Sequence, residues 1–227
     1  MTPTISLNNL GKKFNKEWIF RDLNYEIKPN QKLLILGGNG SGKSTLLQVI
    51  SGFVTPNEGQ VNFLDSARND SDSVRNEMSI RAESRIDPDK TKDLISFASP
   101  YLQVIEDFTL TEMIEHTKLF KPFLENIMTE HALEIIQLQN AKHKLIKQFS
   151  SGMKQRLKLG LAILADTPVL LLDEPISNLD KNAIDWYKTL ISTYTANRTV
   201  IVCSNAIADE HFFCDTELNV MDYKLPK

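Results

Sequence analysis

Nine consecutive residues in the first quarter of the chain have the composition of a phosphate-binding loop. They lie between an apolar, strand-like run at 33–36 and a helix-like run at 46–50, and are Gly37, Gly38, Asn39, Gly40, Ser41, Gly42, Lys43, Ser44 and Thr45. Glycines allow positive φ and close approach to a ligand, so backbone N–H groups can turn toward an anion at the positive end of the next helix. Lys43 is placed to reach the β- and γ-phosphates of a nucleotide, and the Ser44 hydroxyl is placed to ligate Mg²⁺. A plain turn with a surface lysine is the weaker alternative, because all parts occur in the order that phosphate binding requires.

Two adjacent acids lie where a buried strand is expected to end. The run at 169–172 is continuously apolar, as is typical of a central parallel strand, and Asp173 and Glu174 follow it directly. Acids at this end of a strand face the crevice in which open α/β sheets bind ligands. Asp173 can hold Mg²⁺ through water, while Glu174 can orient and deprotonate an attacking water. A solvated acidic pair at the start of a loop is the alternative, and it fits poorly with a buried strand.

The elements that must position these residues alternate between strand-like and helix-like patterns. Strands are expected at 5–9, 19–27, 59–64, 94–98, 169–173, 199–203 and 217–223, and helices at 45–50, 109–119, 125–138, 150–164 and 183–194. The first two strands are typical of a short antiparallel layer over the nucleotide, and the helices between 109 and 138 form a helical insert. The segment 65–92 is strongly polar with few apolar anchors, so we expect a mobile excursion without chemistry of its own.

Length and charge exclude several classes of protein. The chain has 227 residues, which accommodates one large α/β domain but not a second full nucleotide-binding domain. The net charge of −3 and the pI near 5.9 argue against a nucleic-acid binder, which needs a basic surface. No apolar run approaches the roughly 20 residues that span a bilayer, and the N-terminus lacks a signal pattern, so we expect a cytoplasmic protein. Cys203 and Cys214 lack metal-ligand spacing and are interpreted as reduced packing thiols.

Two further segments could contact a nucleotide. Phe14, upstream of the loop, could stack on an adenine, but packing is the ordinary role of an aromatic side chain, and Trp18 is a competing ring. Ser150 is a suitable N-cap for the helix at 150–164, whose free N–H groups could hold an anion. A serine before a helix is usually only a cap, so this segment alone is ordinary.

Taken in order, these motifs make the whole chain resemble the ATP-binding subunit of an ABC transporter. Residues 37–45 resemble the Walker A motif, and 169–174 resemble the Walker B motif with its catalytic glutamate. Residues 177–180 resemble the D-loop, which ends in Asp180. The run Ser150-Ser151-Gly152-Met153-Lys154-Gln155-Arg156 is similar to the signature segment, in a form found in some bacterial subfamilies. Phe14 then falls at the family's adenine-stacking position.

The resemblance implies a fold, ligands and partners. The fold is an α/β P-loop NTPase core with a mainly parallel central sheet, an antiparallel β layer and a helical subdomain near 101–150, all within one domain spanning 1–227. The ligands are ATP and Mg²⁺. The partners are a second ATP-binding subunit, identical or related, and a membrane-spanning permease contacted near 101–119 on the inner face of the cell membrane. In the dimer, Ser150 and Gly152 of one subunit close over the γ-phosphate held by the other.

Two positions depart from the family's pattern. Pro100 stands where the family has the Q-loop glutamine, and proline offers no side-chain oxygen to the metal or the attacking water. Gln103 could replace the glutamine only if the loop is shifted. Asn205 stands at the switch histidine and can donate a hydrogen bond to the γ-phosphate, but it cannot carry a positive charge. ATP binding is therefore better supported than fast hydrolysis.

The expected function is ATP hydrolysis coupled to transmembrane transport. Catalysis would rest on Lys43, Glu174 and Asn205, with Ser44 and Asp173 holding the metal. One alternative is a soluble ABC-type ATPase without a membrane partner. Another is a degenerate subunit that binds ATP and regulates with little hydrolysis.

Overall fold

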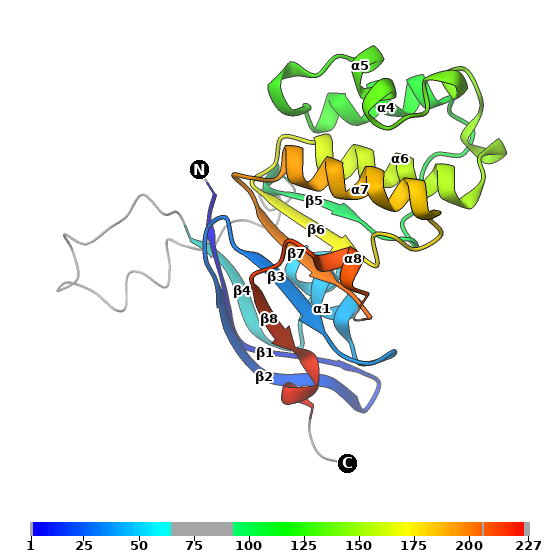
Figure 1. Ribbon diagram of the computed structural model, residues 1–227. Helices are drawn as coiled ribbons and strands as arrows, with labels where there is room; N and C mark the ends of the chain where they lie inside the picture. Colours follow the sequence, from blue (N-terminus) through cyan, green and yellow to red (C-terminus); the bar gives the residue numbers. More distant parts are fainter. Residues whose placement is uncertain (1, 65–92, 206, 225–227) are drawn as a thin grey trace, which may run out of the picture.

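A five-stranded parallel sheet forms the centre of the molecule (Figure 1). The computed structural model describes residues 2–64, 93–205 and 207–224, so the polar segment at 65–92 lies outside the described residues. The strands are β3 (Lys32–Leu36), β5 (Ile95–Ala98), β6 (Val169–Asp173), β7 (Thr199–Cys203) and β8 (Thr216–Asn219), in the order β5-β6-β7-β3-β8. The paired neighbours all run parallel. Their carboxyl ends therefore meet at one edge, which is where sheets of this kind bind ligands.

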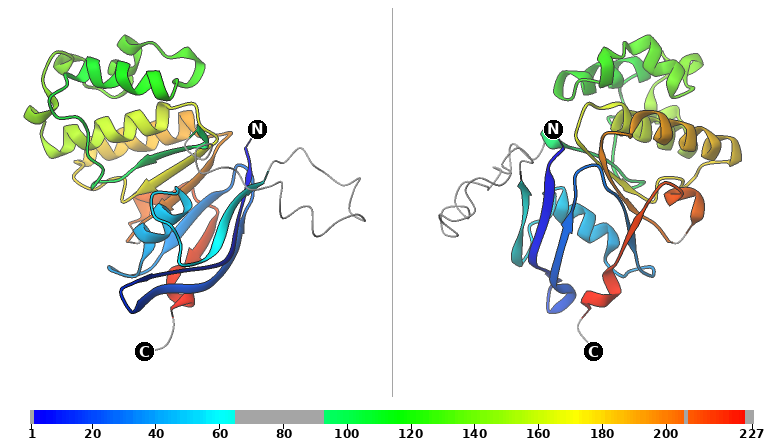
Figure 2. Two further views of the ribbon diagram at one scale, coloured as in Figure 1. Left: turned by 180° about the vertical axis from the view of Figure 1, so that it is seen from behind. Right: turned by 60° about the vertical axis from the view of Figure 1, so that its left-hand side comes forward.

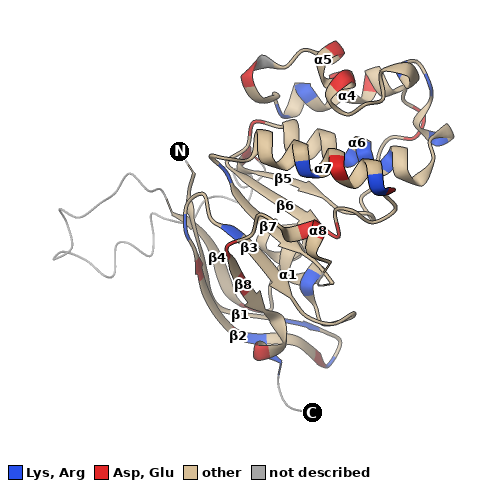
Figure 3. Ribbon diagram, in the orientation of Figure 1, with Lys and Arg blue, Asp and Glu red and all other residues tan. Residues whose placement is uncertain are grey.

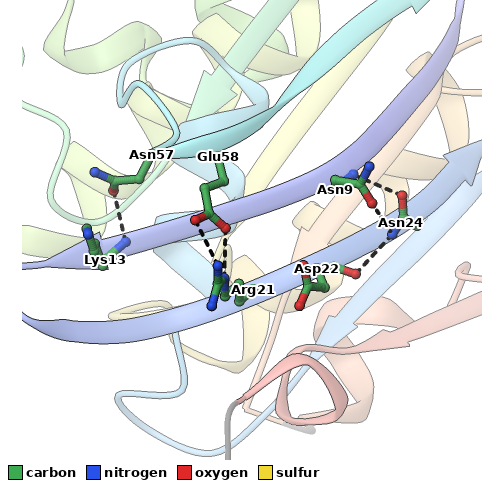
Figure 4. Close-up of polar contacts among 7 residues, drawn as sticks. All are labelled: Asn9, Lys13, Arg21, Asp22, Asn24, Asn57 and Glu58. Carbon is green, nitrogen blue, oxygen red and sulfur yellow. Dashed lines mark hydrogen bonds and ion pairs between the residues drawn. The ribbon is translucent and has the colours of Figure 1, made fainter.

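The second layer is an antiparallel sheet. It consists of β1 (Thr4–Phe14), β2 (Glu17–Ile27) and β4 (Glu58–Leu64), with β1 in the middle. Side chains link its strands (Figure 4): Arg21 donates two hydrogen bonds to Glu58, at 2.8 and 3.0 Å, across the intervening strand. The predicted antiparallel layer is thus confirmed, although both N-terminal strands are longer than the sequence indicated.

One glycine of this layer is required by close packing. Gly59 has a φ of 72°, and a Cβ atom there would lie 2.2 Å from the carbonyl oxygens of Asn8 and Asn9. Only glycine combines this backbone conformation with so close an approach. β4 can therefore pair with β1 through the irregular register between Asn8 and Gly11.

α1 and the antiparallel layer cover one face of the parallel sheet, and α6 and α7 cover the other. α1 (Lys43–Ile50) shares a core with the antiparallel layer and with Leu171 of β6. α6 (Ser151–Leu164) and α7 (Lys181–Tyr194) share the other core with Leu170 and Leu172. Successive residues of β6 thus enter different cores, as the period of a strand requires. Figure 2 shows this layered arrangement from two further sides. The α/β fold expected from the sequence is confirmed.

The helical insert is less regular than expected. α4 (Leu110–Phe120) begins at the capping box of Thr109 and Glu112, close to the predicted start. The predicted helix at 125–138 is only partly correct, because α5 spans Thr129–Ile135 and a 3-10 turn, Leu124–Asn126, precedes it. Glu125 and Gln137 have φ of 48° and 57°, which is a left-handed conformation that ends a right-handed helix.

The C-terminal element also differs in part from the expectation. The predicted strand at 217–223 is a strand only over Thr216–Asn219, after which a 3-10 helix runs over Val220–Tyr223. The Asn219 side chain accepts a hydrogen bond from the N–H of Met221 and so caps the turn. In the part of the chain that the structure describes, every helix is too short or too polar to cross a membrane.

Candidate nucleotide-binding site

The glycine-rich loop lies between β3 and α1, at the carboxyl edge of the parallel sheet. Gly40 and Gly42 have φ of 71° and 105°. A Cβ atom on Gly42 would lie 2.3 Å from Cγ2 of Ile19, and one on Gly37 would lie 2.3 Å from the Ser41 Oγ. Glycine at 37 and 42 is therefore dictated by sterics as well as by backbone conformation. A Cβ atom on Gly38 or Gly40 would meet no atom within 4 Å, so crowding constrains only the two ends of this turn.

Lys43 is held inside the loop by oxygen atoms that carry no full charge. Its side chain is 5% exposed, and Nζ donates hydrogen bonds to the carbonyls of Gly37 (2.9 Å) and Gly38 (3.2 Å) and to Oδ1 of Asn205 (2.8 Å). A hollow of about 490 Å³ lies beside it, lined by Leu36, Gly37, Gly38, Asn39 and Asn205. The lysine charge is thus aimed at a space bounded by the loop, with no acid paired to it among the described residues.

Three side chains that carry oxygen atoms meet beside the start of α1. The Ser44 Oγ donates to Oδ1 of Asp173 at 3.0 Å, and the Ser99 Oγ donates to Oδ2 at 3.4 Å. Burial, and then the charge of Glu174, raise the pKa of Asp173, while the two serine hydrogen bonds and Lys43 oppose the rise. The result is a buried group of oxygen ligands, and oxygen is the ligand type that Mg²⁺ prefers.

Glu174 and Asn205 lie side by side at the same edge of the parallel sheet. They follow β6 and β7, which are neighbours in the sheet, and Nδ2 of Asn205 donates to Oε1 of Glu174 at 2.7 Å. The backbone of Glu174 has a φ of 43°, an uncommon conformation for this residue type. A single amide therefore connects Lys43 to the carboxylate that the sequence predicted as the base.

The segment after β5 contains Pro100, at the expected Q-loop position, and Gln103. The Pro100 carbonyl accepts a hydrogen bond from Nζ of Lys158, and Gln103 is exposed on the surface. Within the described residues, Gln103 has no hydrogen bond to Ser44, Asp173 or Glu174. The Ser99 hydroxyl faces Asp173 instead, a contact that the sequence did not predict. Ser99 directly follows β5, and the pairing of β5 with β6 places Ala98 beside Leu172, so the contact depends on the order of the strands.

The loop and the oxygen ligands fit Mg·ATP. The Ser41 Oγ is buried and has no hydrogen-bond partner among the described residues, so it is available to a bound phosphate. Lys43 needs only to exchange two carbonyls for phosphate oxygens. Ser44 and Asp173 already lie within hydrogen-bond distance of each other, as two ligands of one small cation would.

The signature residues lie at the start of α6, away from this loop. Ser150 is the N-cap of α6, and its side chain accepts a hydrogen bond from the N–H of Met153 at 3.2 Å, as expected. A Cβ atom on Gly152 would lie 3.2 Å from the carbonyl oxygen of Asn178, so this end of α6 adjoins the segment after Glu174. Asp180 caps α7 by accepting from the N–H of Ala183 at 2.8 Å. Across the described ranges no hydrogen bond connects Ser150, Ser151 or Gly152 to the loop at 37–45.

Phe14 and Trp18 differ in how open their rings are. Phe14, at the end of β1, is 48% exposed, and Nζ of Lys12 lies 5.0 Å from its ring centre. Trp18 is half-buried, with Lys13 and Arg21 5.0 and 4.7 Å from its ring centre. Phe14 is thus the more accessible ring, and its stacking on adenine remains a prediction.

The chain is similar in sequence to known ATP-binding proteins. The profile of the ABC transporter family matches residues 20–177. The chain is 31% identical over 219 residues to a sulfate/thiosulfate import ATP-binding protein, CysA, of Mesostigma viride, covering 91% of this chain and 58% of the relative. It is 30% identical over 178 residues to the energy-coupling factor transporter ATP-binding protein EcfA1 of Fusobacterium nucleatum, covering 78% of this chain and 63% of that protein. The chain thus spans less than two thirds of the length of each of these relatives.

A solved structure gives the same fold. It is a dimeric ATP-binding cassette in a post-hydrolysis state bound to ADP and Pi, and it superimposes with a TM-score of 0.76 over 98% of this chain and 97% of that chain. The sequence identity is 22%, so the likeness concerns the fold alone.

Proposed function

The chain belongs to the ABC transporter family, and we propose that it is an ATPase subunit that drives a separate membrane-spanning partner. The observation that carries the proposal is the convergence of Lys43, the Ser44–Asp173 pair and Glu174 at one edge of the sheet. We treat residues 1–227 as one ATP-binding domain, with the helical subdomain near 101–150 inserted between the phosphate loop and the signature segment. The reaction is in-line attack of water on the γ-phosphate of ATP.

The residues of the loop bind and orient the triphosphate. Lys43 leaves the carbonyls of Gly37 and Gly38 for the β- and γ-phosphates, and the backbone N–H groups of the loop turn toward the same oxygens. Ser44 and Asp173 would hold Mg²⁺, which when bound would neutralise the negative charge that develops on the transferring phosphoryl group. The Ser99 hydroxyl keeps the Asp173 carboxylate turned toward Ser44.

Glu174 acts on the attacking water. Its carboxylate orients the water and accepts a proton at one of its oxygens, while Asn205 donates to Oε1 and fixes the orientation of the group. Asn205 cannot carry a positive charge, and Pro100 provides no side-chain oxygen. We therefore expect slow hydrolysis by the isolated subunit.

Two subunits would complete the site. The signature residues Ser150, Ser151 and Gly152 are exposed or half-exposed at the start of α6, where a facing subunit could place them over the γ-phosphate of its partner. Asp180 lies at the start of α7, after the segment that adjoins Gly152. This arrangement fits a dimer of two copies or of related subunits.

Exposed apolar side chains in the expected contact segment support the proposal of a permease partner. Tyr101, Leu119 and Phe120 are 79%, 81% and 70% exposed. Tyr101 lines a surface hollow of about 500 Å³ next to α6, which carries Lys154, Arg156 and Lys158 (Figure 3). The permease would bind there and hold the subunit at the inner face of the cell membrane. The relatives described above are named as import and energy-coupling proteins.

Replacement of Lys43 tests the proposal. Lys43→Ala is expected to abolish ATP binding at micromolar concentrations and hydrolysis with it, because the lysine charge offsets phosphate repulsion in the loop. Calorimetric titration with Mg·ATP and phosphate release from the purified chain measure the two effects. Lys28→Ala is the matched control, since Lys28 is exposed and precedes β3. Unchanged affinity in a folded Lys43→Ala chain would contradict the nucleotide site itself.

A further inference from the structure

A tight turn follows β5, and its first two residues are Ser99 and Pro100. The N–H of Leu102 donates to the carbonyl of Ser99 at 3.2 Å and closes the turn. Serine at the first position and proline at the second are both favoured in β-turns. The Ser99 side chain also accepts from the N–H of Tyr101 at 3.3 Å, as serine commonly does in turns. The local sequence therefore favours this turn and places the Ser99 hydroxyl within it.

The Ser99 hydroxyl connects this turn to the acid that we propose as a metal ligand. Ser99 is 4% exposed, and its Oγ donates to Oδ2 of Asp173 at 3.4 Å. The hydroxyl oxygen accepts from the N–H of Tyr101, and its proton remains available for Asp173. A distance of 3.4 Å is long for a hydrogen bond between two oxygen atoms, so a small movement of the turn would break it. The contact with Asp173 thus depends on how firmly the turn is held.

A lysine of α6 holds the second residue of the turn. Nζ of Lys158 donates to the carbonyl of Pro100 at 2.5 Å. Lys158 is half-buried, and within the described ranges no acid forms an ion pair with it. Lys154, one helical turn earlier, instead pairs with Glu106 at 2.5 Å. Hydrogen bonds from a charged donor are stronger than those between neutral groups, so Lys158 is a strong anchor for the turn.

We propose that Lys158 is a positioning residue that fixes the turn at Ser99 and Pro100 from α6, and so keeps the Ser99 hydroxyl on Asp173. The inference rests on the proposed function, in which Asp173 helps to hold Mg²⁺. Groups that donate hydrogen bonds to a metal-binding carboxylate orient it, and their loss weakens metal binding. Lys158 acts on metal binding through the turn and the Ser99 hydroxyl.

Lys158→Met tests the anchor, because it removes the donor and keeps a long side chain with an apolar stem. The measured quantity is the gain in ATP affinity on addition of Mg²⁺, from calorimetric titrations with ATP in excess Mg²⁺ and in EDTA. We expect this gain to fall by about threefold or more, below the roughly 10- to 100-fold that loss of a direct partner of a metal ligand can cost. The affinity in EDTA should stay unchanged, because Lys43 and the phosphate loop are untouched.

Lys147→Met is the matched control for this titration. Lys147 is exposed and pairs with Asp107 at 3.0 Å, in the segment that follows the turn. An exposed ion pair contributes little, so both affinities should be those of the wild type. A Lys158→Met chain with an unchanged gain from Mg²⁺ would overturn the proposal. An equal loss of affinity in Mg²⁺ and in EDTA would also overturn it, because the effect would then not concern the metal.

A double-mutant cycle with Ser99→Ala tests whether Lys158 acts through the Ser99 hydroxyl. Ser99→Ala removes the direct partner of Asp173, and we expect the gain from Mg²⁺ to fall by about tenfold. Lys158→Met should have no further effect in the Ser99→Ala chain, because the hydroxyl that it positions is absent. Multiplied effects would mean that the two residues act independently, and they would overturn the proposal.

Hydrogen exchange tests the anchor in the absence of nucleotide. The N–H groups of Tyr101 and Leu102 both donate to Ser99, and they should exchange faster in Lys158→Met than in the wild type or in Lys147→Met. Equal exchange in the three proteins would overturn the proposal. A wild type whose ATP affinity does not depend on Mg²⁺ would contradict the proposed metal site, while faster exchange of these two groups in Lys158→Met would still support the hold of Lys158 on the turn.

Discussion

Asn205 stands where the resemblance predicts the switch histidine. Its amide accepts from Lys43 at 2.8 Å and donates to Glu174 at 2.7 Å, so both polar ends are used. A neutral imidazole also has one acceptor and one donor nitrogen, and it could make both contacts. Unlike the amide, the imidazole can take up a proton and carry positive charge.

Replacement by histidine should therefore speed the chemical step. We expect Asn205→His to raise the single-turnover rate by about tenfold at saturating Mg·ATP, less than the roughly 100- to 1,000-fold that one transition-state donor can contribute. ATP affinity should change little, because the loop and Lys43 remain. Asn140→His, at an exposed position, is the control. A variant slower than the wild type would contradict the switch role assigned to Asn205.

The sequence predicted most of the catalytic side chains because they lie in local motifs. Lys43, Ser44, Asp173 and Glu174 each begin, end or directly follow a regular element, so the end of the element sets their position. Ser99 was missed because its role depends on strand pairing: only the parallel neighbours β5 and β6 bring it to Asp173.

Among the elements, the strands were predicted more accurately than the helical insert. β6 and β7 are continuous apolar runs, as strands covered on both faces require, whereas the helix expected at 125–138 is interrupted by left-handed residues at Glu125 and Gln137. Neither residue type indicates that conformation, because tertiary packing imposes it. The helix periodicity was present, but it could not locate the breaks.

The start of β7 carries a buried cationic cluster that affects the pH dependence of stability. Arg198 is 4% exposed and donates to the carbonyl of Ile163, the Ser96 Oγ and the Thr167 Oγ1. Nζ of Lys32, in β3, donates to the carbonyls of Arg198 and Thr195. Burial, and then the Arg198 charge, lower the pKa of Lys32 to about 8.

Lys32 should make the protein more stable as the pH rises. An unfolded lysine has a pKa of about 10.4, so between pH 8 and this value the unfolded chain binds more protons, and the free energy of unfolding increases with pH. Lys32→Met is expected to lose this increase, as measured by urea unfolding at several pH values. Lys28→Met, an exposed control, should follow the wild type. If the free energy of unfolding changed with pH in the same way in Lys32→Met and in the wild type, the lowered pKa of Lys32 would be contradicted.

For the whole molecule, the phosphate loop and the signature segment lie at different places on one chain. The loop carries Lys43 and Ser44, with Asp173 beside it, whereas Ser150 and Gly152 lie at the start of α6, next to Asn178. A nucleotide bound to one loop would thus leave its outer side uncovered. Two copies facing each other could cover both nucleotides with signature residues, and hydrolysis would then separate them.

A variant that binds but does not hydrolyse should therefore accumulate as a dimer. Glu174→Gln removes the base, while its amide oxygen can still accept the hydrogen bond from Asn205, so the ligand contacts remain nearly isosteric. We expect size-exclusion chromatography with light scattering to show a dimer with Mg·ATP and a monomer without it. Gly152→Glu in the same background is the control, because it places a charged side chain where the facing γ-phosphate would lie, and it should stay monomeric. A Glu174→Gln chain that remains monomeric at high protein and ATP concentrations would contradict the homodimer.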